Sequence, residues 1–199
     1  MKKLTTIFFP DISGFTEFVN ETEIEHGKHI IASLLEEVIK SNNQNFIVSE
    51  IEGDSVLFYK NDKLLDLNEL LTLALKIYRE FHKHREELDH STHCTCGACS
   101  SINKLTLKFI IHTGEVKSIK IFNFEKLYGL DVIIAHRLLK NNINSKEYIL
   151  VTNTAGLSIN NTNIPTGLNG PQPFTQQYGS IGNVEGIYFI FNQNASISA

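Results

Sequence analysis

Apolar residues along this chain fall either in short runs or at helical spacing. The first run, residues 4–9 (LTTIFF), is β-branched and aromatic and predicts a strand that ends at Pro10. Between residues 14 and 40 apolar positions recur every three or four residues, which predicts two helical pieces with a break at Gly27. Residues 46–59 (FIVSEIEGDSVLFY) predict two strands joined by a Gly-Asp turn.

The second half of the chain continues this interleaving. Residues 64–90 and 130–140 have the period of amphipathic helices. Strands are predicted at 105–116, 116–122, 147–152 and 186–191, a weak helix at best at 153–160, and a surface loop at 161–182. The resulting order, β-α-β-β-α-β with additions, predicts an α+β fold of ferredoxin-like type with a mostly antiparallel sheet under helices.

Length and composition indicate an ordinary globular domain. The 199 residues fit one domain, with a core at 4–152, a cysteine loop at 91–101 and a C-terminal loop and strand at 161–192. Hydrophobic residues make up 42% of the chain and the net charge is −4, so it lacks the basic footprint of a nucleic-acid binder. We therefore expect no nucleic-acid partner.

The N-terminus and the cysteines predict a cytoplasmic protein. The first apolar run is too short for a signal peptide, and no span approaches the roughly 18 apolar residues of a membrane helix. All three cysteines fall within residues 94–99, an odd number in one loop, which fits a reducing compartment better than a disulfide framework. We therefore expect no membrane association.

Two acidic residues stand where chemistry is expected. Asp11 follows the first strand, and Asp54 lies at the tip of the predicted hairpin. In a ferredoxin-like sheet these elements are neighbours, so the two carboxylates could form an oxygen-rich site for Mg²⁺ or Mn²⁺, the ions that bind nucleotide phosphates. Alternatively, Asp11 caps the following helix and Asp54 only makes a turn.

Four stretches in order resemble one known family. They are FFPDISGFTEF (8–18), EIEGDSVLFY (50–59), FIIHTGEV (109–116) and LYGLDVIIAHRLL (127–139). Together they resemble the catalytic domain of class III nucleotidyl cyclases, the adenylate and guanylate cyclases. The chain is similar to a divergent bacterial-type single-domain member with an added Cys-rich loop. The resemblance covers residues 5 to about 140, and the C-terminus matches loosely.

The resemblance implies a ferredoxin-like palm that forms a head-to-tail homodimer with active sites in the interface. It implies two Mg²⁺ or Mn²⁺ ions, a nucleoside triphosphate substrate, and a cyclic mononucleotide and pyrophosphate as products. The metal ligands would be Asp11, Asp54 and the main-chain carbonyl of Ile12. Backbone amides of Phe15 and Thr16, at a helix start, would bind phosphate oxygens.

Other positions match the family less well. Arg137 falls on the arginine that stabilises the transition state, but Ile133 occupies the position of an asparagine. Glu50 matches the base-selecting residue of guanylate cyclases, whereas its partner, Lys126, fits neither the adenine nor the guanine pattern. Glu185 falls near an expected triphosphate-binding lysine. A catalytically inactive nucleotide-binding or interaction module is therefore an alternative.

Non-catalytic roles also stay open for several of these residues. Glu50 and Glu52 could lie on the solvent face of an edge strand, and Arg137 could pair with a surface carboxylate. His112 and His136 are expected to be structural.

The segment HCTCGACSS (93–101) is foreign to the cyclase pattern. His93, Cys94, Cys96 and Cys99 could ligate zinc or iron, although the spacing is not that of a standard zinc finger. Unligated or redox-responsive thiols are the alternatives. A metal or redox sensor built on a cyclase-like scaffold is therefore the third functional hypothesis.

Overall fold

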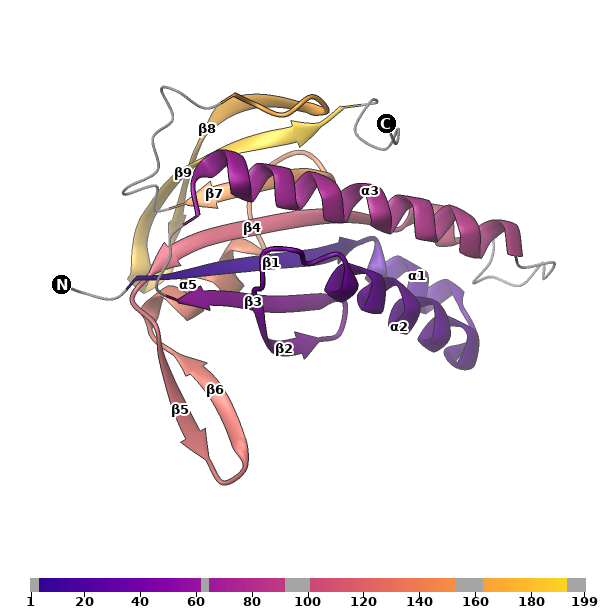
Figure 1. The fold of residues 1–199 in the computed structure, drawn as a ribbon, viewed down its shortest axis with the longest axis horizontal. Helices are drawn as coiled ribbons and strands as arrows, with labels where there is room; N and C mark the ends of the chain where they lie inside the picture. The colour runs from indigo at the N-terminus through magenta and orange to yellow at the C-terminus, as the bar shows by residue number, and fades with distance from the viewer. Residues whose placement is uncertain (1–3, 62–64, 92–100, 153–162, 193–199) are drawn as a thin grey trace.

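The computed structural model describes residues 4–61, 65–91, 101–152 and 163–192. Its centre is a seven-stranded sheet in the order β2-β3-β1-β4-β7-β9-β8 (Figure 1). The strands are β1 (Thr5–Ser13), β2 (Ile47–Glu52), β3 (Ser55–Asn61), β4 (Thr106–Gly114), β7 (Tyr148–Thr152), β8 (Leu168–Tyr178) and β9 (Gly182–Phe191). All neighbours are antiparallel except β4 and β7. The order β2-β3-β1-β4 confirms the predicted α+β ferredoxin-like fold.

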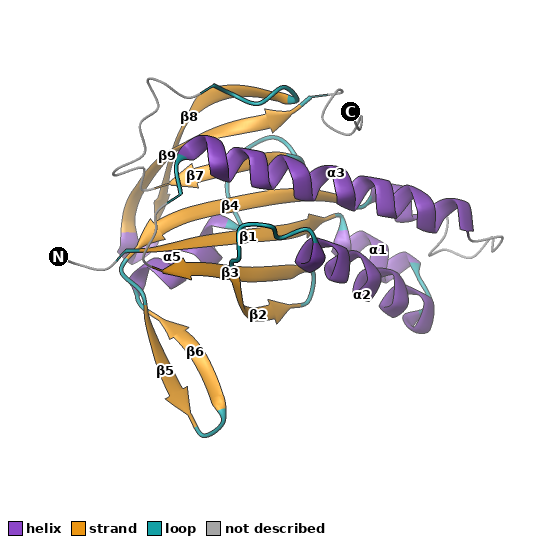
Figure 2. Ribbon diagram, viewed as in Figure 1, coloured by secondary structure: helices purple, strands orange, loops and turns teal. Residues whose placement is uncertain are grey.

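Helices cover both faces of the sheet (Figure 2). They are α1 (Phe15–Glu21), α2 (Ile24–Lys40), α3 (Leu67–Ser91) and α5 (Leu130–Leu138). Phe8 and Ile12 of β1 belong to the core under α2 and α3, whereas Ile7 and Phe9 belong to the core under α5. All nine positions of β1 are buried as a result. Within the described ranges, no helix is long and apolar enough to cross a membrane.

The first strand continues past Pro10, so the prediction that it ends there is wrong. The pairing of β1 with β4 runs without a gap from Thr5 to Ser13. On the other side, the pairing with β3 omits Phe9 and Pro10 and resumes at Asp11. Proline lacks a backbone N–H, and an interrupted ladder on one side tolerates that loss. The strand thereby delivers Asp11 in an extended, fully paired segment.

The break between the first two helices lies at Thr22 and Glu23, not at Gly27 as predicted. Thr22 has an extended backbone that ends α1, and Gly27 lies in the second turn of α2. A Cβ at Gly27 would lie 2.8 Å from Thr22 Oγ1 and 3.5 Å from the Phe18 ring. Glycine therefore allows close packing where α1 meets α2. This explains why Gly27 lies inside a helix although glycine often marks a helix break.

The polar segment predicted as a loop at 161–182 contains strand β8, so that prediction is also wrong. Leu168, Phe174 and Tyr178 are its buried positions, and the strand pairs with β9 along most of its length. The register shifts between Asn169 and Gln172, so Gly170 and Pro171 lie in a bulge. The predicted weak helix at 153–160 lies outside the described residues.

A two-stranded hairpin extends away from the main sheet (Figure 1). Its strands are β5 (Lys117–Ile121) and β6 (Phe124–Tyr128). The strand expected at 116–122 is confirmed as β5, whereas β6 has no counterpart among the predicted elements. Phe122 is 91% exposed and Phe124 is 78% exposed, so the hairpin carries large apolar side chains into solvent.

A buried polar cluster joins α3 to the start of β7. Tyr78 Oη donates a hydrogen bond of 2.7 Å to the Glu147 carboxylate, and the Thr106 hydroxyl donates a second one. His82 Nε2 lies 3.4 Å from the same carboxylate. These donors, His82 foremost, lower the pKa of Glu147 to about 2, and burial of Tyr78 beside Glu147 raises the tyrosine pKa.

Glu147→Gln is expected to lower the free energy of unfolding at pH 7 by about 1–2 kcal/mol, because charged hydrogen bonds at a partly exposed group are lost. The wild-type contribution is present above pH 4.5 and disappears as pH falls towards about 2, since the folded pKa is lowered. Urea unfolding at pH 7 and pH 3 measures both effects. The exposed Glu36→Gln is the control, and an equal loss at the two pH values would contradict the prediction.

Candidate functional site

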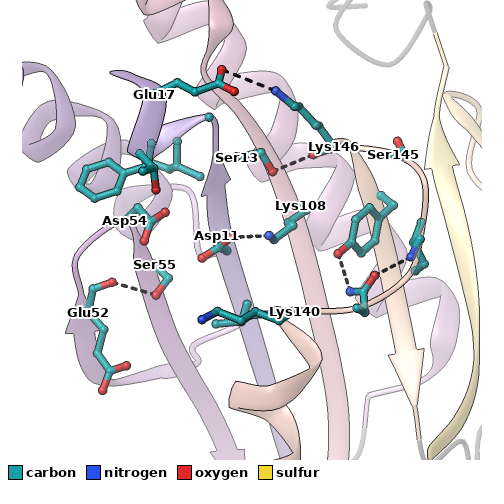
Figure 3. Close-up of a pocket in the computed structure, with 18 residues that line it drawn as sticks. Asp11, Ser13, Glu17, Glu52, Asp54, Ser55, Lys108, Lys140, Ser145 and Lys146 are labelled. Carbon is teal, nitrogen blue, oxygen red and sulfur yellow. Dashed lines mark hydrogen bonds and ion pairs between the residues drawn. The ribbon is translucent and has the colours of Figure 1, made fainter. Parts of the chain in front are cut away.

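An open cavity of about 630 Å³ lies where β1 ends and the β2–β3 turn begins (Figure 3). It is lined by residues from four parts of the chain: Asp11–Glu17, the β2–β3 turn with Glu52, Asp54 and Ser55, Lys108 of β4, and the segment that follows α5 up to Tyr148. The structure thus brings together five residues predicted from sequence, namely Asp11, Ile12, Phe15, Thr16 and Asp54.

Register places the two aspartates next to each other. Asp11 is the Cα partner of Ser55, the residue after Asp54, and the Ile12 N–H donates a 2.9 Å hydrogen bond to the Asp54 carbonyl. Burial and the negative charge of Asp11 raise the pKa of Asp54 to about 6. Burial also raises the pKa of Asp11, against the opposing effect of Lys108. Two desolvated carboxylates facing one cavity favour binding of a cation.

The start of α1 forms the rim of this cavity. Gly14 precedes the helix with φ 88°, and a Cβ there would lie 2.8 Å from the Lys104 carbonyl oxygen. Glycine is therefore required for the chain to turn directly from β1 into α1. Phe15 and Thr16 follow in the first helical turn and line the cavity.

Lys108 is a site residue that the sequence reasoning missed. It is the Cα partner of Asp11 on β4, and its Nζ lies 2.9 Å from Asp11 Oδ2, with both side chains more than 80% buried. Lys140 and Lys146 also line the cavity. Lys108 is the one Lys, Arg, Asp or Glu in the mostly apolar run 105–114. A charged residue inside a predicted buried strand is unusual, and this could have marked Lys108 as a candidate site residue.

Lys108→Met is expected to lower the free energy of unfolding by about 2–3 kcal/mol at pH 7, because it leaves two partly buried carboxylates without a counter-charge. It should also make Mn²⁺ alone bind more tightly, since a competing cation is gone. Denaturant titration and Mn²⁺ titration measure the two effects. Lys146→Met, whose ammonium is exposed at the same cavity, should change stability little, and equal behaviour of the two variants would contradict this role for Lys108.

Glu50 and Lys126 are close together, but neither lines the cavity of Asp11 and Asp54. Lys126 Nζ lies 3.5 Å from Glu50 Oε2, and His136 Nε2 lies 3.5 Å from Glu50 Oε1. The interpretation of Glu50 as a purely solvent-facing residue is wrong, because its side chain is only 20% exposed.

The α5 residues matched to the cyclase pattern do not line the Asp11 cavity. Ile133 is 50% exposed, and neither it nor Arg137 borders the space around Asp11 and Asp54. Glu185 borders a different cavity together with His112. In the structure, His112 is 2% exposed and contacts Thr152 Oγ1 at 2.8 Å. A structural role, as expected from sequence, accounts for these contacts of His112.

The predicted zinc or iron ligands His93, Cys94, Cys96 and Cys99 lie outside the described residues. In the parts of the chain that the structure describes, one group of three or more potential ligands is close enough to share an ion. It consists of Glu50, Glu52 and His136.

Residues 31–148 match the family described as "Protein of unknown function (DUF2652)". This range is more than half of the chain. The chain belongs to the DUF2652 family. The matched range includes Asp54 and Lys108 and begins after Asp11.

The chain also resembles a mycobacterial protein. It is 31% identical over 125 residues to "Uncharacterized protein Rv2561/Rv2562" of Mycobacterium tuberculosis. The alignment covers 61% of this chain and 57% of the relative, so the chain spans little more than half of that protein's length.

Solved structures with a similar fold are cyclase domains of the class III type. The guanylyl cyclase Cya2 matches with a TM-score of 0.65 at 15% identity, covering 100% of this chain and 99% of that one. The guanylate cyclase domain of RhGC from Catenaria anguillulae, in complex with GTP, gives 0.65 at 16% identity over 96% and 98%. The adenylyl cyclase CyaB from P. aeruginosa gives 0.58 at 18% over 100% and 98%. The DUF2652 chain therefore has the class III cyclase fold.

Proposed function

We propose that the cavity of Asp11 and Asp54 binds a nucleoside triphosphate together with Mg²⁺ or Mn²⁺, and that the chain is a divergent class III nucleotidyl cyclase. The observation that carries this proposal is the convergence of one buried carboxylate, one partly buried carboxylate and three lysines on one open cavity of a cyclase fold. Lysines suit phosphate oxygens and carboxylates suit hard cations, so this mixture fits a metal-bound triphosphate better than either ligand alone.

The residues present fit a hard divalent cation. Asp11 and Asp54 would supply carboxylate oxygens, and Ile12, whose N–H donates to the Asp54 carbonyl, also lines the cavity. Burial and the nearby Asp11 charge raise the pKa of Asp54, and a bound cation would stabilise its ionised carboxylate. When bound, the ions would neutralise the triphosphate and polarise the reacting phosphate.

Lys108 is the residue best placed to bind phosphate from within the chain. Its ammonium already faces Asp11 inside the cavity, with Lys140 and Lys146 further along the wall. The amides at the start of α1 supply neutral donors beside these charges. The RhGC guanylate cyclase domain, whose fold is similar, is a complex with GTP, which supports a nucleoside triphosphate as the ligand class.

In the proposed reaction the ribose 3′-oxygen forms a bond to the α-phosphorus as the bond to pyrophosphate breaks. The products are a cyclic mononucleotide and pyrophosphate, and the 3′-hydroxyl proton leaves to solvent or to a base. Arg137, absent from the cavity of its own chain, would act from a second copy in a head-to-tail homodimer. One protein of similar fold is described as a "non-canonical dimeric guanylyl cyclase domain", which supports dimer formation by this fold but not a particular arrangement.

A nucleotide-binding module without turnover is the second candidate. Ile133 occupies the position of a polar transition-state residue and offers no hydrogen bond. The Glu50 carboxylate, matched to the base-selecting position, is already close to Lys126 and His136. Both departures affect turnover and base selection. Neither changes the residues proposed to bind the metal and the phosphates.

Turnover is tested by incubating the full chain with Mn²⁺ and each α-labelled nucleoside triphosphate, followed by chromatography of the products. The proposal predicts a cyclic mononucleotide from at least one nucleotide, absent in Asp11→Asn and reduced at least about 100-fold in Arg137→Ala. Nucleotide binding without product would favour the non-catalytic module. Product formation that survives Asp11→Asn would contradict the assigned site.

A further inference from the structure

Glu50, Glu52 and His136 form a compact cluster beside the Asp11 cavity. Glu50 and Glu52 are two residues apart on β2, so their side chains share one face of the strand. The register of β2 against β3 shifts between Val48 and Glu50, and such a bulge re-aims the side chains that follow it. His136 reaches this face from α5 and packs edge-on against Phe9 at 5.1 Å.

The separations within the cluster are longer than hydrogen bonds. His136 Nε2 lies 3.5 Å from Glu50 Oε1, and His136 Nδ1 lies 3.5 Å from Glu52 Oε2. Glu50 Oε1 is a solvent-inaccessible oxygen without a hydrogen-bond partner among the described residues. A desolvated carboxylate oxygen with no donor is costly unless a further group binds it.

The 3.5 Å separation between an imidazole nitrogen and its nearer carboxylate matches the spacing of two ligands around a small metal ion, and the third residue offers a ligand atom within 4.8 Å of both. Zinc binds histidine nitrogen and carboxylate oxygen at about 2.0–2.2 Å, and ligand atoms around a tetrahedral ion at that range are roughly 3.3–3.6 Å apart. One ligand atom from each of the three residues lies within 4.8 Å of the others. A single ion would take one imidazole nitrogen and one oxygen from each carboxylate.

We propose that Glu50, Glu52 and His136 bind a transition-metal ion of the Zn²⁺ class. Imidazole with two carboxylates suits Zn²⁺ and its neighbours in the first row, whereas Mg²⁺ prefers oxygen ligands alone. Three protein ligands leave a fourth position open to water or to another ligand. This site adjoins the Asp11 and Asp54 cavity, which Glu52 also lines, but it uses neither aspartate and does not depend on nucleotide binding there.

Two cations compete with a metal ion at this cluster. Lys126 Nζ lies 3.5 Å from Glu50 Oε2, which leaves Oε1 for the ion but adds positive charge nearby. A protonated His136 between the two carboxylates is the other competitor. Removing the lysine charge should therefore tighten metal binding, a sign that a purely structural ion pair would not produce.

Zinc affinity, measured by competition with a chromophoric chelator, tests the site. The protein is the untagged full chain carrying Cys94→Ser, Cys96→Ser, Cys99→Ser and Asp54→Asn, which removes the thiols and the proposed nucleotide-metal site. Co²⁺ absorption in the visible range reports whether nitrogen and oxygen ligands surround the ion. Circular dichroism confirms that each variant is folded.

One zinc ion per chain is expected in this background. Glu52→Gln, at a half-exposed side chain, and His136→Gln should each weaken binding at least about 10-fold. Lys126→Met should tighten it about 5-fold, and the exposed control Glu36→Gln should leave it unchanged. No binding in the background protein, or an affinity in Glu52→Gln and His136→Gln equal to that of the background protein, would overturn the proposal and leave a histidine–carboxylate ion pair.

Discussion

Asp54→Asn is expected to make the protein more stable at pH 7 while abolishing binding of a metal–nucleotide complex. Burial and the nearby Asp11 charge raise the pKa of Asp54 to about 6, so its ionised form is held at a cost in the folded protein. An asparagine removes that charge and should raise the free energy of unfolding by about 1–2 kcal/mol.

The pH dependence of this effect has a definite sign. Because the folded pKa of Asp54 is raised above 3.8, wild-type stability falls as pH rises through the interval from about 4 to about 6. The difference between Asp54→Asn and the wild type should therefore be small at pH 4 and full at pH 7. Thermal unfolding at the two pH values measures it, with Glu36→Gln as the control.

The loss of binding affinity should be a much larger effect than the gain in the free energy of unfolding. Asp54 is one of two carboxylates proposed to bind the cation, so its removal should weaken Mn²⁺-dependent nucleotide binding at least about 100-fold. Calorimetric titration of both proteins with Mn²⁺ and nucleotide checks this. A variant that is stabilised but binds as the wild type does would show that Asp54 is a turn residue, the alternative that the sequence left open.

Phe124→Asp combined with Phe122→Asp is expected to dissociate a homodimer. Both phenylalanines lie at the tip of the β5–β6 hairpin with 78% and 91% of their surfaces exposed, next to Ile121 at 53%. Large apolar side chains gathered on a projecting element are typical of an interface. Two charges placed there would have to be desolvated on association.

Sedimentation velocity of the wild type and the double variant measures the change. Ile24→Asp is the matched control, because Ile24 is 83% exposed on α2, away from the hairpin. The double variant should be monomeric and, since Arg137 lies outside its own chain's cavity, should lose turnover more than binding. A wild-type monomer, or a double variant that stays dimeric, would contradict this interface.

The sequence was informative where local pattern and sheet order coincide. The apolar run before Asp11 and the Gly-Asp turn at Asp54 predicted two neighbouring strands, and the register of β1 with β3 confirms that they meet. Ordered motifs predicted the cyclase fold, which the solved relatives confirm. Whether the residues act as the motifs imply stays a prediction.

The wrong or missing predictions depend on strand order and register, which the sequence of a single segment does not determine. Lys108 belongs to the site because β4 pairs with β1 residue for residue, which depends on sheet order and register. Pro10 is tolerated inside β1 because its missing donor coincides with a gap in the ladder to β3. Strand β8 escaped prediction because its pairing with β9 outweighs a polar, glycine- and proline-containing sequence.

Binding of a 3′-deoxynucleoside triphosphate with Mn²⁺ tests whether the Asp11 and Asp54 cavity holds a metal–nucleotide complex. Such analogues lack the attacking hydroxyl, so equilibrium dialysis measures occupancy of the Asp11 and Asp54 cavity without turnover. We expect saturable binding with a dissociation constant below about 1 mM for at least one base. This binding should be lost without Mn²⁺ and in Asp11→Asn. Absence of binding for all four bases, or binding that needs neither Mn²⁺ nor Asp11, would contradict the proposal.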